Sequence, residues 1–253
     1  MKIAVCLKQV ITRETHVRPN ASATWIREDG ASWALNEPDA FALEEGLRLK
    51  ETHGGEVVVV SAGPARVCQV LREALARGAD RAIHVQDDAL GTADAWAGAL
   101  AVADAVKAEA FDIVLTGLQS DDQGHGQFGP VLAERLGMPH STIIMEVQID
   151  GGALRAKREL EGGWFQYVSM PLPALLTIQS GINQLRYATL KGIMAAKKKD
   201  VRVVAPPAPV APRVKVVALS VPQKSKQTAM ITGSPQEAAR ELVRRLREEA
   251  RAL

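Results

Sequence analysis

The sequence predicts an α/β fold: a mostly parallel, doubly wound, Rossmann-like sheet with an antiparallel extension and a C-terminal arm plus helix. Up to residue 140, short apolar runs alternate with amphipathic segments, which is typical of parallel strands joined by right-handed crossovers. Between residues 142 and 169, alternating runs are separated by Gly-Gly pairs, which indicate hairpins. The last amphipathic segment follows a proline-rich stretch and begins with a capping box.

The first half of the chain supplies the predicted parallel strands, residues 3–7, 56–61, 81–85 and 111–116. Helices are predicted over residues 39–51, 64–77, 93–109 and 130–136. We place Glu44 and Glu45 on the polar face of the first helix, Thr92 at the N-cap of the third and Pro130 at the first position of the fourth. Residues 9–37 are polar and irregular, so a long loop or a small hairpin is expected there.

The second half is predicted to extend the sheet in an antiparallel manner. Strand-like runs cover residues 142–150, 153–160, 164–169 and 174–179, and their simplest role is to cover a sheet edge. Residues 180–199 have no clear period and end in a lysine triplet. Such a segment suits either a mobile docking loop for an acidic partner or a solvated end of an element.

The C-terminal segment is predicted to be an arm followed by a helix. Residues 206–212 form a stiff, proline-rich linker, and the polar residues 220–232 are expected to wrap over a surface. Ser234 and Glu237 make the capping box, with Pro235 at the first helical position. The helix should run to the C-terminus and bury its apolar stripe on its own core or on a second subunit.

Composition narrows the class of protein. The 253 residues are 47% hydrophobic, enough for a real core, and 31 basic residues nearly balance 29 acidic ones. This balance argues against a nucleic-acid binder. Cys6 and Cys68 lie far apart in apolar surroundings, which favours free thiols over a disulfide or a zinc site. No run approaches about 18 apolar residues, so we expect a cytoplasmic protein without membrane insertion.

A glycine-rich loop, Gly117 to Pro130, is the predicted binding element. It lies between a strand and a helix, where backbone N–H groups gather at the positive end of a helix. Its four glycines would let the backbone approach a ligand. Three other segments, at residues 6–10, 61–63 and after Val85, also follow strands and therefore converge on the same sheet edge. We interpret this edge as a mononucleotide phosphate site; the alternative is an ordinary surface loop.

Catalytic motifs are missing from the sequence. It has no Walker loop, GxSxG, HExxH or paired catalytic carboxylates in a recognisable frame. Asp121 and Asp122 are adjacent acids of the kind that cap loops, and His125 has no partner acid or nucleophile nearby in sequence. We therefore expect binding without chemistry, with no catalytic residue and no metal site.

The chain resembles the beta subunit of electron transfer flavoprotein. The resemblance runs with few gaps from residue 1 to about residue 200, and the last of its motifs is quite specific to the family. It is carried by VCLKQV (5–10), Asn36, ALEEGLRLKE (42–51), SAGP (61–64), ALARGADR (74–81), GLQSDDQGHGQFGP (117–130) and RYATLKGIMAAKKK (186–199).

This resemblance implies a non-enzymatic electron carrier that works as a heterodimer. An alpha subunit would hold most of the FAD, and the beta subunit would pack against that flavin and bury a structural AMP. The position that often brings a Tyr to the flavin ring is Arg13 here, so Arg13 is the expected flavin-proximal side chain. The AMP contacts would be Cys6, Asn36, Glu37, Pro38, Asp39, Ala62, Gly117, Leu118, Gln119, Ser120, Asp121, Asp122, Gln123, Gly124, His125, Gly126, Gln127 and Phe128.

The resemblance also implies partners and domains. Residues 1–200 would form the nucleotide-binding domain, including a partner-recognition loop at 183–196, and residues 201–253 an arm and helix that pack on the partner subunit. Leu190 would anchor the loop in an apolar pocket of an acyl-CoA dehydrogenase, beside Tyr187, Ile193 and Met194. Electrons from fatty acid β-oxidation would pass on to a membrane quinone oxidoreductase.

The sequence leaves two other functions possible. In bifurcating members of the family a second FAD replaces AMP, and Asp39 and Gly129-Pro130 also occur there. A stand-alone adenylating or ATP-hydrolysing enzyme would need a metal or lysine arrangement around the phosphates. The loop from Gly117 to Pro130 contains no Lys or Arg.

Overall fold

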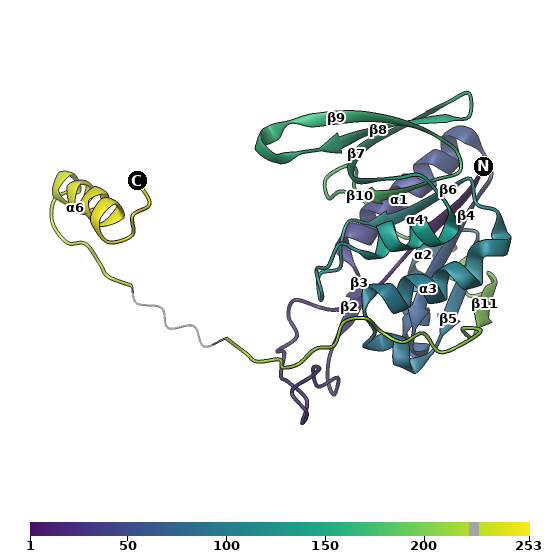
Figure 1. Ribbon diagram of the computed structural model, residues 1–253, viewed down its shortest axis with the longest axis horizontal. Coiled ribbons are helices and arrows are strands. Elements are labelled where there is room, and N and C mark those ends of the chain that lie inside the picture. The colour runs from purple at the N-terminus through teal and green to yellow at the C-terminus, as the bar shows by residue number, and fades with distance from the viewer. Residues whose placement is uncertain (223–227) are drawn as a thin grey trace. The chain divides into compact units, whose positions relative to one another are not determined.

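The computed structural model describes residues 1–222 and 228–253, which form two units, residues 1–219 and 220–253. The strands of the first unit are β1 (Lys2–Cys6), β2 (Gln9–Ile11), β3 (Trp33–Leu35), β4 (Glu56–Gly63), β5 (Arg81–Gln86), β6 (Ile113–Gly117), β7 (His140–Asp150), β8 (Ala153–Glu159), β9 (Phe165–Pro171), β10 (Ala174–Ile178) and β11 (Val201–Val204). The main sheet has the order β11-β5-β4-β1-β6-β10-β7-β8-β9, and β2 pairs with β3 in a small antiparallel hairpin (Figure 1).

The chain order of the parallel strands creates a switch point in the sheet. From β1 the chain moves outward to β4 and β5 and then returns to β6 on the other side of β1. The crossover helices are α1 (Glu37–His53), α2 (Cys68–Arg77), α3 (Ala95–Val106) and α4 (Phe128–Leu136). This arrangement confirms the predicted Rossmann-like α/β fold. The chain segments that follow the neighbouring strands β1 and β6 run to opposite faces of the sheet, which defines the switch point.

Two helical layers cover the sheet, and the side chains of β1 alternate between them. Ile3 and Val5 pack into the core beneath α1 and α2, whereas Ala4 and Cys6 pack into the core beneath α3 and α4 (Figure 1). Buried on both faces, β1 reads as a continuous apolar run, which is why its sequence predicted a parallel strand.

The antiparallel extension is formed by β7, β8 and β9 at one edge of the sheet. The expectation that residues 174–179 belong to this extension is wrong. Strand β10 instead lies between β6 and β7 and pairs in parallel with both. All five of its residues are buried, and such burial requires a neighbour on each side rather than an edge position.

Local expectations at the helix ends are corrected in two places. Asp94, not Thr92, is the N-cap of α3, because its carboxylate accepts a hydrogen bond from Ala97 N–H at 2.9 Å. Helix α4 begins at Phe128, so Pro130 is its third residue rather than its first. Pro130 still lies in the first turn of α4, where backbone N–H groups have no acceptor within the helix, so the N–H that proline lacks is not missed.

Glu44 and Glu45, which the sequence placed on the polar face of α1, are both buried in the structure. Arg186 donates from Nε to a Glu44 oxygen at 3.0 Å and also pairs with Glu51. Asn183 donates to Glu45 at 3.1 Å. Burial alone would raise the pKa of Glu44, but the hydrogen bonds and charge of Arg186 hold it below its ordinary value. These contacts fix residues 183–186 along α1.

Residues 180–199 contain a helix that the sequence did not reveal. Helix α5 (Leu190–Ala196) begins at the N-cap Thr189, whose side chain accepts from Gly192 N–H. The lysine triplet is not simply a solvated end, because Lys199 donates to the Leu75 carbonyl at 3.0 Å at the end of α2. A cation at a helix C-terminus complements the partial negative charge there.

The C-terminal part of the chain confirms the capping box but not the full length of the last helix. Helix α6 (Pro235–Glu248) has reciprocal bonds between Ser234 and Glu237, and it ends before the C-terminus. Within the described residues of its unit, α6 has no buried side chain. The first unit extends past residue 200 to include β11 and the arm up to Leu219. Of the expected wrapping segment, residues 223–227 lie outside the described residues.

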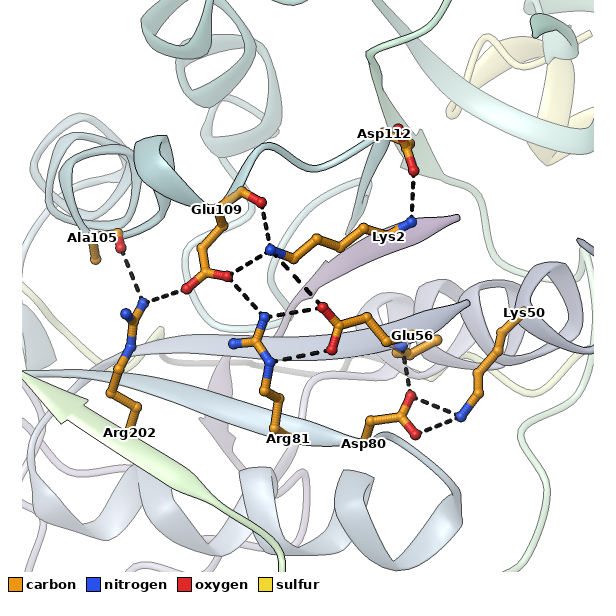
Figure 2. Close-up of polar contacts among 10 residues, drawn as sticks. Lys2, Lys50, Glu56, Asp80, Arg81, Ala105, Glu109, Asp112 and Arg202 are labelled. Atoms are coloured by element: carbon orange, nitrogen blue, oxygen red, sulfur yellow. Dashed lines mark hydrogen bonds and ion pairs between the residues drawn. The ribbon is translucent and has the colours of Figure 1, made fainter. Parts of the chain in front are cut away.

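The amino ends of the parallel strands are joined by an ion-pair network (Figure 2). Glu109, just before β6, accepts from Lys2 at 2.9 Å and pairs with Arg81 and Arg202 at 2.8 Å each. These basic side chains stand on β1, β5 and β11. Burial raises the pKa of Glu109, but Lys2 and Arg81 lower it further, to about 2. Glu109 therefore connects the edge strand β11 to the centre of the sheet.

We predict that Glu109→Gln removes an acid-sensitive part of the stability. The pKa of Glu109 is lowered from 4.5 to about 2 on folding, so its contribution is complete above pH 4.5 and is lost as pH falls toward 2. Urea unfolding of the purified chain should show a wild-type advantage at neutral pH that shrinks on acidification. Glu161→Gln, at an exposed position, is the control; equal acid profiles for wild type and Glu109→Gln would contradict the prediction.

Candidate functional site

A cleft opens at the carboxyl ends of β1, β4 and β6, at the switch point of the sheet. The cleft is open to solvent at its mouth, and the carboxyl edge of an open α/β sheet is the usual place for small-molecule and cofactor sites. Its lining comes from the strand ends, the first turns of α3 and α4, and the loop after β6. The lining residues are Cys6, Leu7, Lys8, Asn36, Asp39, Val60, Ser61, Ala62, Leu90, Ala93, Asp94, Ala95, Gly98, Val102, Thr116, Gly117, Leu118, Gln119, Ser120, Gln123, His125, Gly126, Gln127 and Phe128.

The Asp39 carboxylate holds the two strand ends at the switch point together. One oxygen accepts from Lys8 N–H at 2.7 Å, after β1, and the other accepts from Gly117 N–H at 3.0 Å, at the end of β6. Burial raises the pKa of Asp39 to about 7, while these hydrogen bonds and the charge of Lys8 oppose the rise. The first turn of α1 is thereby fixed against both strands.

Asn36, the N-cap residue of α1, directs its side chain to the glycine-rich loop instead of to its own helix. Its amide nitrogen donates to the Gln119 carbonyl at 3.0 Å, and its amide oxygen accepts from Asp121 N–H at 2.9 Å. The neighbouring Glu37 points away and pairs with Arg13 at 2.6 Å on an exposed surface. Asn36 therefore shapes the loop from a distant part of the chain.

The glycines of the loop serve two different purposes. A Cβ at Gly117 would lie 2.3 Å from an Asp39 oxygen, and one at Gly129 would lie 2.4 Å from Thr177, so these two permit packing inside the protein rather than approach to a ligand. Gly124 and Gly126 have φ values of +64° and +61°, in the left-handed region that other residues avoid. Their turn carries the loop back to the start of α4.

Backbone donors collect where the loop meets α4. The N–H groups of His125, Gly126 and Gln127 donate no hydrogen bond to any other residue that the structure describes. They precede a helix N-terminus, where the partial positive charge of the helix favours an anion. The prediction of an anion-accepting loop at this sheet edge therefore has a geometric basis.

Lys8 brings a cation to the loop, which the loop sequence itself lacks. Its ammonium lies 2.7 Å from Asp122 Oδ1, 3.1 Å from Gln123 Oε1 and 3.2 Å from Ser120 Oγ. Partial burial raises the pKa of Asp122, but Lys8 and the nearby hydrogen bonds hold it below its ordinary value. The sequence placed residues 6–10 at the same sheet edge as the loop but did not single out Lys8, because residue order does not show which side chain of that segment reaches the loop.

The opposite wall of the cleft is apolar, and part of it was also missed. Val60 on β4, Leu90 after β5 and Val102 on α3 line it together with Cys6. Burial, and secondarily the charge of Asp39, raise the pKa of the Cys6 thiol, so it stays protonated and unreactive at neutral pH. An apolar lining together with a polar loop suits a ligand with an aromatic base and an anionic group.

Asp94 connects the cleft to the C-terminal arm. Besides capping α3, its carboxylate accepts from Arg213 N–H at 2.6 Å and Val214 N–H at 2.8 Å. Arg213 also stacks over the ring of Trp96 at 4.7 Å. These contacts hold residues 213–214 beside the first turn of α3. Nothing in the local sequence around Asp94 indicated that it would bind a segment so far along the chain.

Most of the expected nucleotide contacts are brought together. Thirteen line the cleft: Cys6, Asn36, Asp39, Ala62, Gly117, Leu118, Gln119, Ser120, Gln123, His125, Gly126, Gln127 and Phe128. The other five, Glu37, Pro38, Asp121, Asp122 and Gly124, lie outside its lining. The four expected partner-recognition residues form a separate exposed surface, with exposed fractions of 89% for Tyr187, 83% for Leu190, 44% for Ile193 and 64% for Met194.

The cleft offers binding groups rather than a catalytic set. Among residues 1–222 and 228–253, no cluster of His, Cys, Asp or Glu could hold a metal ion. The carboxylates of Asp39 and Asp94 are committed to backbone N–H groups. In the same described residues, no helix is long and apolar enough to cross a membrane.

Comparison with known proteins identifies the family. The electron transfer flavoprotein domain model matches residues 24–209. The chain is 42% identical over 205 residues to the electron transfer flavoprotein subunit beta of Methylophilus methylotrophus, covering 79% of this chain and 78% of the relative. The chain belongs to the electron transfer flavoprotein family, as a beta subunit. Beta subunits of electron transfer flavoprotein are electron-carrier subunits rather than enzymes, and they pair with an alpha subunit.

Two further relatives show the range of the family. The electron transfer flavoprotein subunit beta of Thermoanaerobacterium thermosaccharolyticum is 38% identical over 257 residues, covering 97% of this chain and 98% of its own. The caffeyl-CoA reductase-Etf complex subunit CarD of Acetobacterium woodii is 38% identical over 206 residues, covering 80% of this chain and 78% of its own. The stand-alone ATP-hydrolysing alternative is thus set aside in favour of a flavoprotein subunit.

We predict that Asp39→Ala destabilises the beta subunit by about 2 to 4 kcal/mol, because the N–H groups of Lys8 and Gly117 lose their buried acceptor. Asp39→Asn should cost less, since its amide oxygen can still accept one of the two bonds. Chemical denaturation of the purified chain measures both losses. Asp29→Ala, at a position with 90% side-chain exposure, is the control and should change little. An Asp39→Ala variant as stable as that control would contradict the role of Asp39.

Proposed function

We propose that this beta subunit holds a structural AMP in the cleft and forms a heterodimer whose FAD carries electrons from acyl-CoA dehydrogenases to a membrane quinone oxidoreductase. The observation that supports the AMP site is the cleft itself, at the switch point between β1 and β6, where sheets of this type bind nucleotides. The adenine would lie against Val60, Ala62 and Val102, with the phosphate at the loop. We place the heterodimer in the cytoplasm.

The FAD would be held mainly by the alpha subunit and would face the beta subunit near Arg13. The Arg13 side chain is 76% exposed and pairs with Glu37, the first residue of α1, so it lies at the amino end of that helix. A bound flavin supplies the one-electron and two-electron redox chemistry. A fixed cation at Arg13 would favour a negatively charged reduced flavin electrostatically.

The exposed surface of Tyr187, Leu190, Ile193 and Met194 would dock on the dehydrogenase. Leu190 is the first residue of α5, and Thr189 and Lys199 secure the two ends of that segment. Arg186 fastens the preceding residues to α1 through Glu44. A large apolar side chain held rigidly in solvent is typical of a docking anchor.

The C-terminal helix would pack on the alpha subunit. Leu242 and Val243 are 49% and 43% exposed, and they belong to an apolar stripe on α6 that has no cover within its own unit as described. An amphipathic helix with an uncovered apolar stripe suits an apolar groove of a second chain.

A second candidate is a bifurcating subunit with its own FAD in the cleft. It is favoured by the likeness to the CarD subunit, whose name places it in a caffeyl-CoA reductase complex. The cleft is open at its mouth, so an adenylate bound at the loop could continue outward as a dinucleotide. Both candidates place the same adenine and phosphate groups against the same residues.

Nucleotide extraction distinguishes the two candidates. Heterodimer purified from cells, denatured with acid and separated by chromatography, should release one AMP and one FAD. AMP has no absorbance in the flavin bands, so the visible spectrum before denaturation already reports the FAD count. Release of two FAD and no AMP would support the bifurcating candidate. Release of one FAD alone, with no AMP, would contradict a nucleotide site in this subunit.

We predict that Leu190→Ala slows electron transfer from the dehydrogenase by at least tenfold and leaves the FAD content intact, because docking anchors cost about 2 kcal/mol or more when truncated. Stopped-flow reduction of the heterodimer by the reduced dehydrogenase measures the rate. Val217→Ala is a matched control, since Val217 is 85% exposed outside the docking surface. Equal rates for Leu190→Ala and the control would show that Leu190 is not the anchor.

A further inference from the structure

We propose that Lys8 binds the phosphate of the nucleotide, and that Asp122 is a counter-ion which the phosphate replaces. This inference rests on the proposed nucleotide site and extends it to a residue outside the glycine-rich loop. It concerns the phosphate attached to the adenosine, which AMP and FAD share. It therefore applies to either of the two candidate nucleotides.

The backbone of Lys8 is held from both sides. Its N–H donates to Asp39 at 2.7 Å, and its carbonyl accepts from Asn36 N–H at 3.0 Å. Both partners belong to the start of α1, so the position of Lys8 does not depend on the loop that its side chain contacts. A fixed backbone with a flexible side chain suits a residue that exchanges one partner for another.

All three N–H bonds of the Lys8 ammonium point to oxygen atoms of the loop. The acceptors are Asp122 at 2.7 Å, Gln123 at 3.1 Å and Ser120 at 3.2 Å. One anionic oxygen and two neutral ones surround the cation. A phosphate group presents the same kind of oxygen acceptors with more negative charge, so it can take the place of the Asp122 carboxylate.

Charge balance in the cleft also points to Lys8. Of the described residues that line the cleft, Lys8 is the only Lys or Arg. Asp39 and Asp94 line the same cleft and are satisfied by backbone N–H groups, so neither is free to neutralise Lys8. A phosphate entering beside Asp94 and a partly ionised Asp39 is favoured by a cation, and the backbone donors at residues 125–127 supply only partial charge.

Asp122 is placed to act as the exchangeable partner. Its side chain does not line the cleft, whereas Ser120 and Gln123 on either side of it do. The ion pair with Lys8 joins side chains that are 37% and 18% exposed, so it lies at the rim rather than in the core. An ion pair at the rim is weak enough to be exchanged.

The test compares AMP with adenosine, which lacks the phosphate. Full-length heterodimers carrying wild-type, Lys8→Gln, Lys8→Arg or Asp122→Asn beta subunits are dialysed free of exchangeable nucleotide. Each is then titrated calorimetrically with AMP and with adenosine. Lys107→Gln is the matched control, because it removes the same charge from an exposed position just after the C-terminal end of α3, outside the cleft lining.

Lys8→Gln should weaken AMP binding by about tenfold to hundredfold, the usual range for a lost charge-assisted hydrogen bond, and leave adenosine binding unchanged. Lys8→Arg should recover most of the AMP affinity. Asp122→Asn should strengthen AMP binding, because the phosphate no longer competes with a carboxylate, and should not alter adenosine binding. Lys107→Gln should match wild type with both compounds.

The inference is overturned if Lys8→Gln weakens AMP and adenosine equally, because Lys8 then only shapes the loop, or if it changes neither. If Lys8→Gln does not fold, Asp122→Asn decides: weaker or unchanged AMP binding overturns the exchange. A wild-type heterodimer that binds neither AMP nor adenosine, and releases none on denaturation, overturns the proposed nucleotide site itself. The comparison of compounds thus separates the two failures.

Discussion

The structure depends on one buried carboxylate, that of Asp39, at the point where the sheet changes direction. Strands β1 and β6 are neighbours, but the chains that leave them diverge into crossovers on opposite faces. Asp39 bridges the backbone N–H groups just beyond both strands and so keeps their ends aligned. Because a buried carboxyl without partners would be costly, the geometry of the cleft and the start of α1 stabilise each other.

The two ends of the parallel sheet are built differently. At the amino ends, charged side chains pair with one another around Glu109, and the network joins the edge strand β11 to β1 and β5 (Figure 2). At the carboxyl ends, carboxylates and amides bind backbone groups, which leaves loop N–H groups and one lysine available to a ligand. One end therefore contributes mainly to stability, and the other is arranged for binding. This division follows the general behaviour of open α/β sheets.

Local sequence patterns were sufficient to locate most strands and helices but not to predict which elements pack beside them. Apolar runs and glycine stops located β1, β4 and α2, because burial on both faces and a left-handed C-cap leave a local signature. The same patterns misplaced β10, because a buried strand has the same apolar sequence pattern wherever it lies within a sheet. They also did not reveal that Glu44 and Glu45 are buried, because the side chains that bind them, Arg186 and Asn183, lie over 130 residues away.

The sequence by itself determined the fold class and the family and predicted the glycine-rich loop as the binding element, because each rests on residue order over short spans. Tertiary structure alone decided which side chains pair around the cleft: Lys8 with Asp122 at its rim, and Asp94 with the backbone of the arm at Arg213. Those pairs are joined by hydrogen bonds between distant segments, and no periodicity or spacing encodes such contacts. The charge of the cleft, and hence what it can bind, therefore became visible only once the strands had brought their ends together.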